Sequence, residues 1–170
     1  MAAYTTIELA RIAPSPGDGK RLEFELEPGQ VELGGHTYEF SPPLAGARLE
    51  ISRTASGYAL RLTFAGEVIG PCMRCLGPAA VEIAVEAREV DQPGTDDEEL
   101  RSPYVTEGEL DLNAWGHDSL VLAMPQRLLC RPDCAGLCAV CGESLNDAEP
   151  GAHHHPSEPD PRWDKLRELQ

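Results

Sequence analysis

The sequence has very little lysine and no cluster of positive charge. Its 170 residues include 14 basic ones, of which only Lys20 and Lys165 are lysines, and the rest are scattered arginines. Against them stand 29 acidic residues, so the formal net charge is −15. A protein that binds nucleic acid through its phosphates usually carries the opposite charge. We therefore expect any contact with RNA to be local or to be made through a partner.

Long apolar runs are also missing. No stretch approaches the roughly 20 apolar residues that span a membrane, and residues 1–15 lack the apolar core of a signal peptide. These absences predict a cytoplasmic protein without a membrane contact. Cytosolic thiols are kept reduced, so we expect the six cysteines to be free thiols or metal ligands rather than a disulfide framework.

The familiar motifs of catalysis are absent from the sequence. It contains no Walker-type phosphate loop, dinucleotide fingerprint, nucleophile elbow or His-Glu-x2-His pair. We therefore predict that the protein is not an enzyme.

Residues 1–90 show the pattern of a β-rich domain. Between Leu22 and Glu89 apolar side chains recur at every second position, which is the period of strands that bury one face. The clearest runs are Leu22, Phe24 and Leu26; Leu49 and Ile51; Tyr58, Leu60, Leu62 and Phe64; and Val81, Ile83, Val85 and Ala87. Gly- and Pro-rich turns separate them. The fold class predicted is α+β, with an antiparallel sheet or small open β-barrel, a packed helix and a C-terminal zinc-binding segment.

Residues 91–109 interrupt the alternation with a high density of acidic side chains. Like charges at this density resist collapse, so we expect an acidic linker or loop.

Residues 110–125 are predicted to form a helix that packs on the sheet. Asp111 can cap its N-terminus and Pro125 ends it. The side chains at helical spacing are Leu112, Trp115, Ser119 and Leu122. Gly116 in the interior costs about 1 kcal/mol relative to alanine, so the helix should depend on tertiary contacts.

The densest chemical signal is a run of four cysteines within residues 126–170, a Cys/His-rich segment that should end in a short helix starting at Asp160. The four are Cys130, Cys134, Cys138 and Cys141. The segment has too few large apolar side chains for its own core, and a structural zinc ion supplies on the order of 10–16 kcal/mol of folding free energy in small metallo-domains. We therefore predict a structural Zn²⁺ held by these four thiolates.

Other donors leave the set of ligands open. Cys72 and Cys75 form an upstream Cys-x2-Cys pair, and a triple histidine lies downstream at His153, His154 and His155. Any of these side chains can complete a zinc shell. The Cys-x2-Cys pair also permits thiol redox chemistry, although the strand pattern that follows it offers no helix N-terminus to activate a thiol.

Several strings together resemble the bacterial YceD family, described as large ribosomal RNA subunit accumulation proteins. The strings are Cys72-Met73-Arg74-Cys75-Leu76, the segment 110–125 ending in Leu-Ala-Met-Pro, the run from Leu129 to Gly142, Leu145-Asn146 and Asp160-Pro161-Arg162. Their order and spacing cover most of the chain.

The resemblance implies a cytoplasmic, non-enzymatic factor needed for accumulation of large-subunit ribosomal RNA. Many cysteine-bearing members of that family place a Cys-x-Cys pair where this chain has His153-His154-His155. Some relatives lack the cysteine cluster, which implies that metal supports the fold rather than the activity. Two alternatives remain, a zinc-dependent adaptor unrelated to ribosomes and a thiol redox or metal-handling protein.

The acidic charge and the ribosomal resemblance together favour an indirect role. A chain of charge −15 can act on ribosomal RNA by binding a basic ribosomal protein or large-subunit assembly factor. The sequence makes no prediction of the oligomeric state.

Overall fold

A computed structural model describes residues 5–149 and 153–155 of the chain. The helix expected from Asp160 lies outside the described residues. In order, the elements are β1 (Thr6–Glu8), α1 (Leu9–Ile12), β2 (Gly19–Leu26), β3 (Gln30–Leu33), β4 (His36–Ser41), β5 (Ala45–Arg53), β6 (Tyr58–Pro71), β7 (Pro78–Asp91), the 3-10 helix η1 (Glu98–Leu100), β8 (Val105–Thr106), β9 (Glu109–Asp111) and α2 (Leu112–Ala123).

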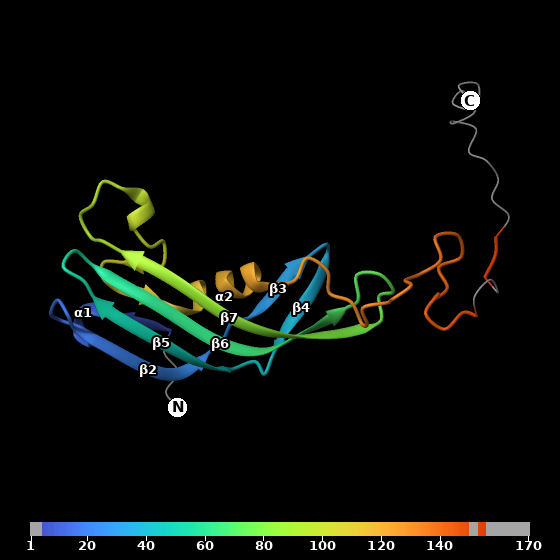
Figure 1. Ribbon diagram of the computed structural model, residues 1–170, viewed down its shortest axis with the longest axis horizontal. Coiled ribbons are helices and arrows are strands. Elements are labelled where there is room, and N and C mark those ends of the chain that lie inside the picture. The colour runs from blue at the N-terminus through green and yellow to red at the C-terminus, as the bar shows by residue number, and fades with distance from the viewer. Residues whose placement is uncertain (1–4, 150–152, 156–170) are drawn as a thin grey trace, which may run out of the picture.

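The main sheet is antiparallel and is organised around β6. One edge of β6 pairs first with β5, through Tyr58–Phe64, and then with β4, through Glu67–Ile69. Its other edge pairs with β7 over all 14 residues. The β6–β7 hairpin is therefore the longest feature of the sheet, and its turn extends beyond the other strands (Figure 1). The prediction of an antiparallel sheet is confirmed, and within the described residues its strands do not close into a barrel.

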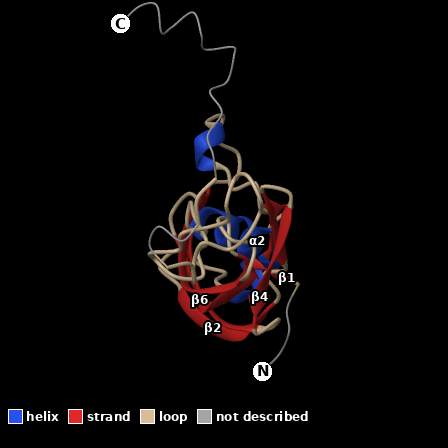
Figure 2. Cartoon of the chain, turned by 90° about the vertical axis from the view of Figure 1, so that its right-hand side faces the viewer, coloured by secondary structure: helices blue, strands red, loops and turns tan. Residues whose placement is uncertain are grey.

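The strands curve around helix α2, which covers the concave face (Figure 2). The alternation seen in the sequence matches the alternation of burial, because every second side chain is buried along β5 and along β6 as far as Phe64. The core includes Phe24, Leu26, Leu49, Ile51, Leu60, Leu62 and Phe64 from the sheet. Leu112, Trp115 and Leu120 of α2 join them. Fully burying one such side chain contributes about 1.5–3 kcal/mol, so this cluster is the main stabilising feature of the fold.

Helix α2 begins where the sequence predicts. Asp111 is its N-cap, and its Oδ1 accepts a hydrogen bond of 2.9 Å from the backbone N–H of Ala114. One predicted core position is wrong, because Leu122 is 86% exposed and Leu120 is buried instead. Gly116 packs on β2, since a Cβ atom at this position would lie 2.7 Å from Leu26 Cδ2. The glycine thus permits the close approach of helix and sheet.

A second, three-stranded sheet joins the N-terminal strand β1 to the segment that leads into α2. Strand β9 pairs with β1 on one side and with β8 on the other. The segment 91–109, expected to be a loop or linker, contains η1 and β8. Gln92 N–H donates to the Leu100 carbonyl at 2.8 Å, while the acidic side chains between them are exposed.

The outer face of the main sheet carries a row of charges that crosses four strands. Glu50 on β5 lies between Arg21 on β2 and Arg61 on β6, with N–O distances of 2.8 and 3.4 Å. Arg61 and Arg88 in turn both contact Glu86 on β7, at 2.9 Å each. Exposed pairs of this kind contribute little to stability. They do engage three arginines with carboxylates of the same chain.

No helix within the described residues is long and apolar enough to cross a membrane.

Candidate metal centre

The turn of the β6–β7 hairpin presents Cys72 and Cys75 at the end of the sheet. Its backbone is closed by two hydrogen bonds, from Cys72 N–H to the Gly77 carbonyl at 2.7 Å and from Leu76 N–H to the Cys72 carbonyl at 2.9 Å. Arg74 N–H points at the Cys72 Sγ atom at 3.5 Å. Leu76, which follows the second cysteine, has a φ of 59°. We call Cys72–Gly77 the first cysteine turn.

The chain that follows α2 packs against this turn. Met73 N–H donates to the Leu128 carbonyl at 2.9 Å, and the Leu128 side chain is buried. Arg74 Nη1 donates to the Cys134 carbonyl at 2.7 Å. These contacts attach residues 128–134 to the hairpin at two points and bring Cys130 and Cys134 to the first cysteine turn.

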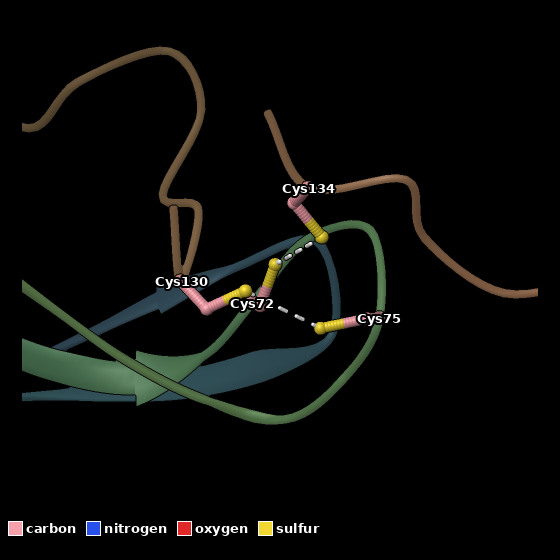
Figure 3. Close-up of side chains that lie close together, drawn as sticks. All are labelled: Cys72, Cys75, Cys130 and Cys134. Carbon is pink, nitrogen blue, oxygen red and sulfur yellow. Dashed lines mark hydrogen bonds between the residues drawn. The ribbon is translucent and has the colours of Figure 1, made fainter. Parts of the chain in front are cut away.

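The four cysteines Cys72, Cys75, Cys130 and Cys134 form one cluster, the four-cysteine group (Figure 3). Their sulfur atoms all lie within 4.8 Å of one another. The Cys72–Cys134 and Cys75–Cys130 Sγ distances are 3.7 and 3.6 Å. Four thiolates about 2.3 Å from a tetrahedral zinc ion are separated by about 3.8 Å, whereas a disulfide requires about 2.05 Å. The spacing and the donor type therefore fit a zinc ion and do not fit disulfides.

The thiols of the four-cysteine group differ in acidity. Burial acts to raise the pKa of Cys72, but hydrogen bonds from the backbone N–H groups of Cys75, Arg74 and Cys130 outweigh it and lower this pKa to about 6. Desolvation and the neighbouring Cys75 and Cys134 sulfurs raise the pKa of Cys130 to about 12. Four thiolates this close repel one another, so full ionisation of the group needs a cation among them.

The first cysteine turn is repeated in the C-terminal segment. Cys138 N–H donates to the Glu143 carbonyl at 2.8 Å, and Gly142 N–H donates to the Cys138 carbonyl at 2.9 Å. Val140 N–H points at Cys138 Sγ at 3.4 Å, and Gly142 has a φ of 76°. We call Cys138–Glu143 the second cysteine turn. Hydrogen bonds from the backbone N–H groups of Cys141 and Val140 lower the pKa of Cys138 to about 6.

A second cluster of donors surrounds this turn. It comprises Cys138, Cys141, His153 and His155, whose nearest ligand atoms also lie within 4.8 Å of one another. We call it the cysteine–histidine group. His154, between the two histidines, is exposed and belongs to neither group.

The structure thus divides the predicted run of cysteines between two clusters. Cys130 and Cys134 join Cys72 and Cys75, which the sequence offers only as alternative ligands, while Cys138 and Cys141 join His153 and His155. No group among the described residues contains all four members of the run. A count of donors indicates only that there are enough for two tetrahedral shells, because the chain has six cysteines and three neighbouring histidines in these segments. It does not indicate which cysteines share a shell.

Comparison with known proteins links both clusters to one family. The family model described as large ribosomal RNA subunit accumulation protein YceD matches residues 60–170. The chain belongs to the YceD family. The matched region begins in β6 and contains all eight donors of the two groups. The family description concerns the accumulation of large-subunit ribosomal RNA and names no reaction. It supports a role related to ribosomes in general terms.

The relatives found are mycobacterial proteins. Uncharacterized proteins of Mycobacterium bovis and Mycobacterium tuberculosis are each 31% identical over 175 residues, which cover 99% of this chain and 83% of the relative. An uncharacterized protein of Mycobacterium leprae is 31% identical over 133 residues, or 73% of this chain and 60% of the relative. No solved structure matches this member of the YceD family.

Proposed function

We propose that this protein is a non-enzymatic, cytoplasmic ribosome biogenesis factor needed for accumulation of large-subunit (23S) ribosomal RNA. The observation that carries the proposal is the YceD family match over residues 60–170, which takes in the long hairpin, helix α2 and both donor groups.

The partner we propose is a protein with a basic surface, either a ribosomal protein or a large-subunit assembly factor. The charge of −15 disfavours direct binding to an RNA backbone, and Arg21, Arg61 and Arg88 are already paired with glutamates. Asp96, Asp97, Glu98 and Glu99 are exposed in the segment 91–109. None of the ion pairs among the described residues involves this segment, so its charge is free to attract a basic partner.

The cofactor we propose for the four-cysteine group is a structural Zn²⁺. Four thiolates form a closed shell without an open position for a substrate, which is typical of structural rather than catalytic zinc. When bound, the ion would join the hairpin turn to residues 128–134. Its role is to hold the C-terminal segment against the sheet, where only Leu128 and Cys134 of residues 126–149 supply buried apolar side chains.

The decisive experiment depletes the protein and measures ribosomal RNA. Depletion should lower mature 23S RNA relative to 16S RNA, and the protein should co-sediment with precursors of the large subunit. A normal RNA profile in depleted cells would overturn the proposed function.

A charge variant tests the proposed partner. Asp96→Asn, Asp97→Asn, Glu98→Gln and Glu99→Gln together should weaken co-sedimentation and reduce its salt sensitivity. The matched control neutralises Glu27, Glu39, Glu67 and Glu82, which are exposed elsewhere on the chain, and should keep binding. Tight binding of the purified protein to ribosomal RNA at physiological salt, without affinity for ribosomal proteins or assembly factors, would contradict the indirect role.

A further inference from the structure

The second cysteine turn has the same hydrogen-bond pattern as the first. In both turns the first cysteine bonds through its N–H to the carbonyl five residues on, and its carbonyl accepts from the N–H four residues on. In both, the N–H of the residue two positions on points at the first sulfur, at 3.5 Å in one turn and 3.4 Å in the other. Backbone N–H groups aimed at a sulfur stabilise its thiolate form, which is the form that binds metal. A turn with this pattern therefore presents a ligand pair wherever it occurs.

The two histidines complete the second cluster. His153 Nε2 lies 3.2 Å from Cys141 Sγ, and His155 Nε2 lies 3.0 Å from His153 Nε2. These two distances are a few tenths of an ångström shorter than the edges of a tetrahedral zinc shell, which are about 3.3–3.8 Å for bonds of about 2.0–2.3 Å. All four donor atoms lie within 4.8 Å of one another, so small shifts would bring them onto one ion.

The second ring nitrogen of His153 lies near a carboxylate, which is a common arrangement for histidines that bind metal. While His153 Nε2 faces the cluster, its Nδ1 lies 3.5 Å from Glu143 Oε2. A carboxylate on the second ring nitrogen orients an imidazole and makes it a better ligand. Glu143 belongs to the second cysteine turn itself, so the turn supplies both a ligand pair and the group that orients a third ligand.

Burial of apolar side chains does not explain how this part of the chain is ordered. Among described residues 137–149 and 153–155, none is buried. A segment without a core requires another source of folding free energy, and a tetrahedral metal ion is one.

We propose that the chain binds a second Zn²⁺ through Cys138, Cys141, His153 and His155, independently of the ion proposed for the four-cysteine group. No ligand is shared between the two groups, so either can fill without the other. The shells also differ in charge, because two thiolates balance one Zn²⁺ whereas four leave an excess of two negative charges. This second site extends beyond the proposed function and does not depend on it.

The test measures zinc per chain in the full-length protein after equilibration with zinc and removal of the excess. The wild type should hold two ions. The double variant His153→Ala/His155→Ala should hold one fewer than the wild type, and His154→Ala should match the wild type because its side chain lies outside the cluster. Co²⁺ can be bound in place of Zn²⁺, and its absorption spectrum depends on its ligands. The spectrum of the wild type minus that of the double variant should be that of a mixed sulfur and nitrogen shell.

The outcomes separate this site from the four-cysteine group. Loss of one ion from the double variant supports the second site even if the wild type holds only one. A wild type with one ion and a double variant with none would contradict zinc in the four-cysteine group instead. Cys75→Ser/Cys130→Ser should remove the other ion and leave the mixed-shell Co²⁺ spectrum. Equal zinc content in the wild type and the double histidine variant would overturn the second site. Circular dichroism of the sheet serves as the check that each variant is folded.

Discussion

The Sγ atoms of Cys72 and Cys134 lie 3.7 Å apart although 62 positions separate the residues in the sequence. Both side chains are fully buried, one at the turn of the long hairpin and the other in the segment that follows α2. The contact joins the longest hairpin of the fold to a segment that has almost no core of its own. The dependence of this contact on a bound metal ion can be measured by hydrogen exchange in each region of the chain.

Removal of zinc should release the C-terminal segment and leave the sheet folded. Without the ion, residues 128–146 keep few buried apolar contacts, whereas β5 and β6 retain the main core. Hydrogen exchange measured before and after treatment with a strong chelator should show loss of protection in 128–146 alone. Unchanged protection in that segment would argue against a metal ion that holds it to the hairpin. Loss of protection throughout β5 and β6 would show that the metal supports the whole fold.

Leu76→Gly should stabilise the first cysteine turn. Leu76 has a φ of 59°, and a left-handed conformation costs a non-glycine residue roughly 1–2 kcal/mol. Its side chain is 55% exposed, so little burial is lost, and the larger freedom of glycine in the unfolded chain offsets only about 0.4–1 kcal/mol. We expect a net gain of up to about 1 kcal/mol in thermal or denaturant unfolding.

Gly142→Ala is the reciprocal change in the second turn. Its φ is 76° and nothing lies within 4 Å of an added Cβ, so the cost is backbone strain alone, about 1–2 kcal/mol. Competition with a chromogenic chelator should show weaker zinc retention. A stability change of the same sign in both variants would contradict the equivalence of the two turns.

The stability of the protein should fall at high pH through Tyr104. Desolvation, together with the hydrogen bond that the Tyr104 hydroxyl donates to Asp118 Oδ2 at 3.1 Å, raises the pKa of this phenol from 10.0 to about 12. Because the pKa is higher in the folded state, the stabilisation is complete below pH 10 and is lost as the pH rises through about 12.

An absorbance titration of tyrosinate checks this shift. The difference between the wild type and Tyr104→Phe should show one ionisation near pH 12, and Asp118→Asn should move it to lower pH because the carboxylate charge is gone. A difference curve centred near pH 10 would contradict the prediction.

Gly116→Ala should destabilise the protein although alanine is the better helix former. A Cβ atom there would lie 2.7 Å from Leu26 Cδ2, and the Leu26 side chain is fully buried and has little room to move. Overpacking of a core costs about 1–3 kcal/mol, against a gain of about 1 kcal/mol in helix propensity. Denaturant unfolding should show the loss, while Leu122→Ala on the exposed face should be close to neutral.

The strands and the main helix could be predicted because their signals are local. The alternation through Leu49 and Ile51 reports which face is buried, and Asp111 marks the start of α2. Helical spacing places Leu122 on the predicted apolar stripe, but spacing alone does not show how wide a part of the helix the core covers. Leu120 is fully buried and Met124 packs against the core, whereas Leu122 between them is exposed.

The partition of the cysteines could not be predicted from spacing. Cys130 meets Cys75 because Leu128 is buried beside Met73 at the hairpin turn, which is a tertiary contact. In the sequence the same cysteine stands four residues before Cys134 and eight before Cys138, so the run resembles one site. The turn at Gly136, with a φ of 82°, lies where the chain passes from one group to the other.

The contact between Cys75 and Cys130 spans 55 positions and encloses β7, the segment 91–109 and α2. A covalent link that closes a loop of this size lowers the conformational entropy of the unfolded chain. In the chain-entropy model this raises the free energy of unfolding by about 4 kcal/mol. A metal ion bound here would act as the same kind of cross-link, but it would need no oxidant and would open when the ion is withdrawn. Stability would then increase with the concentration of free zinc. The availability of the metal thus determines the fraction of molecules in which this loop is closed.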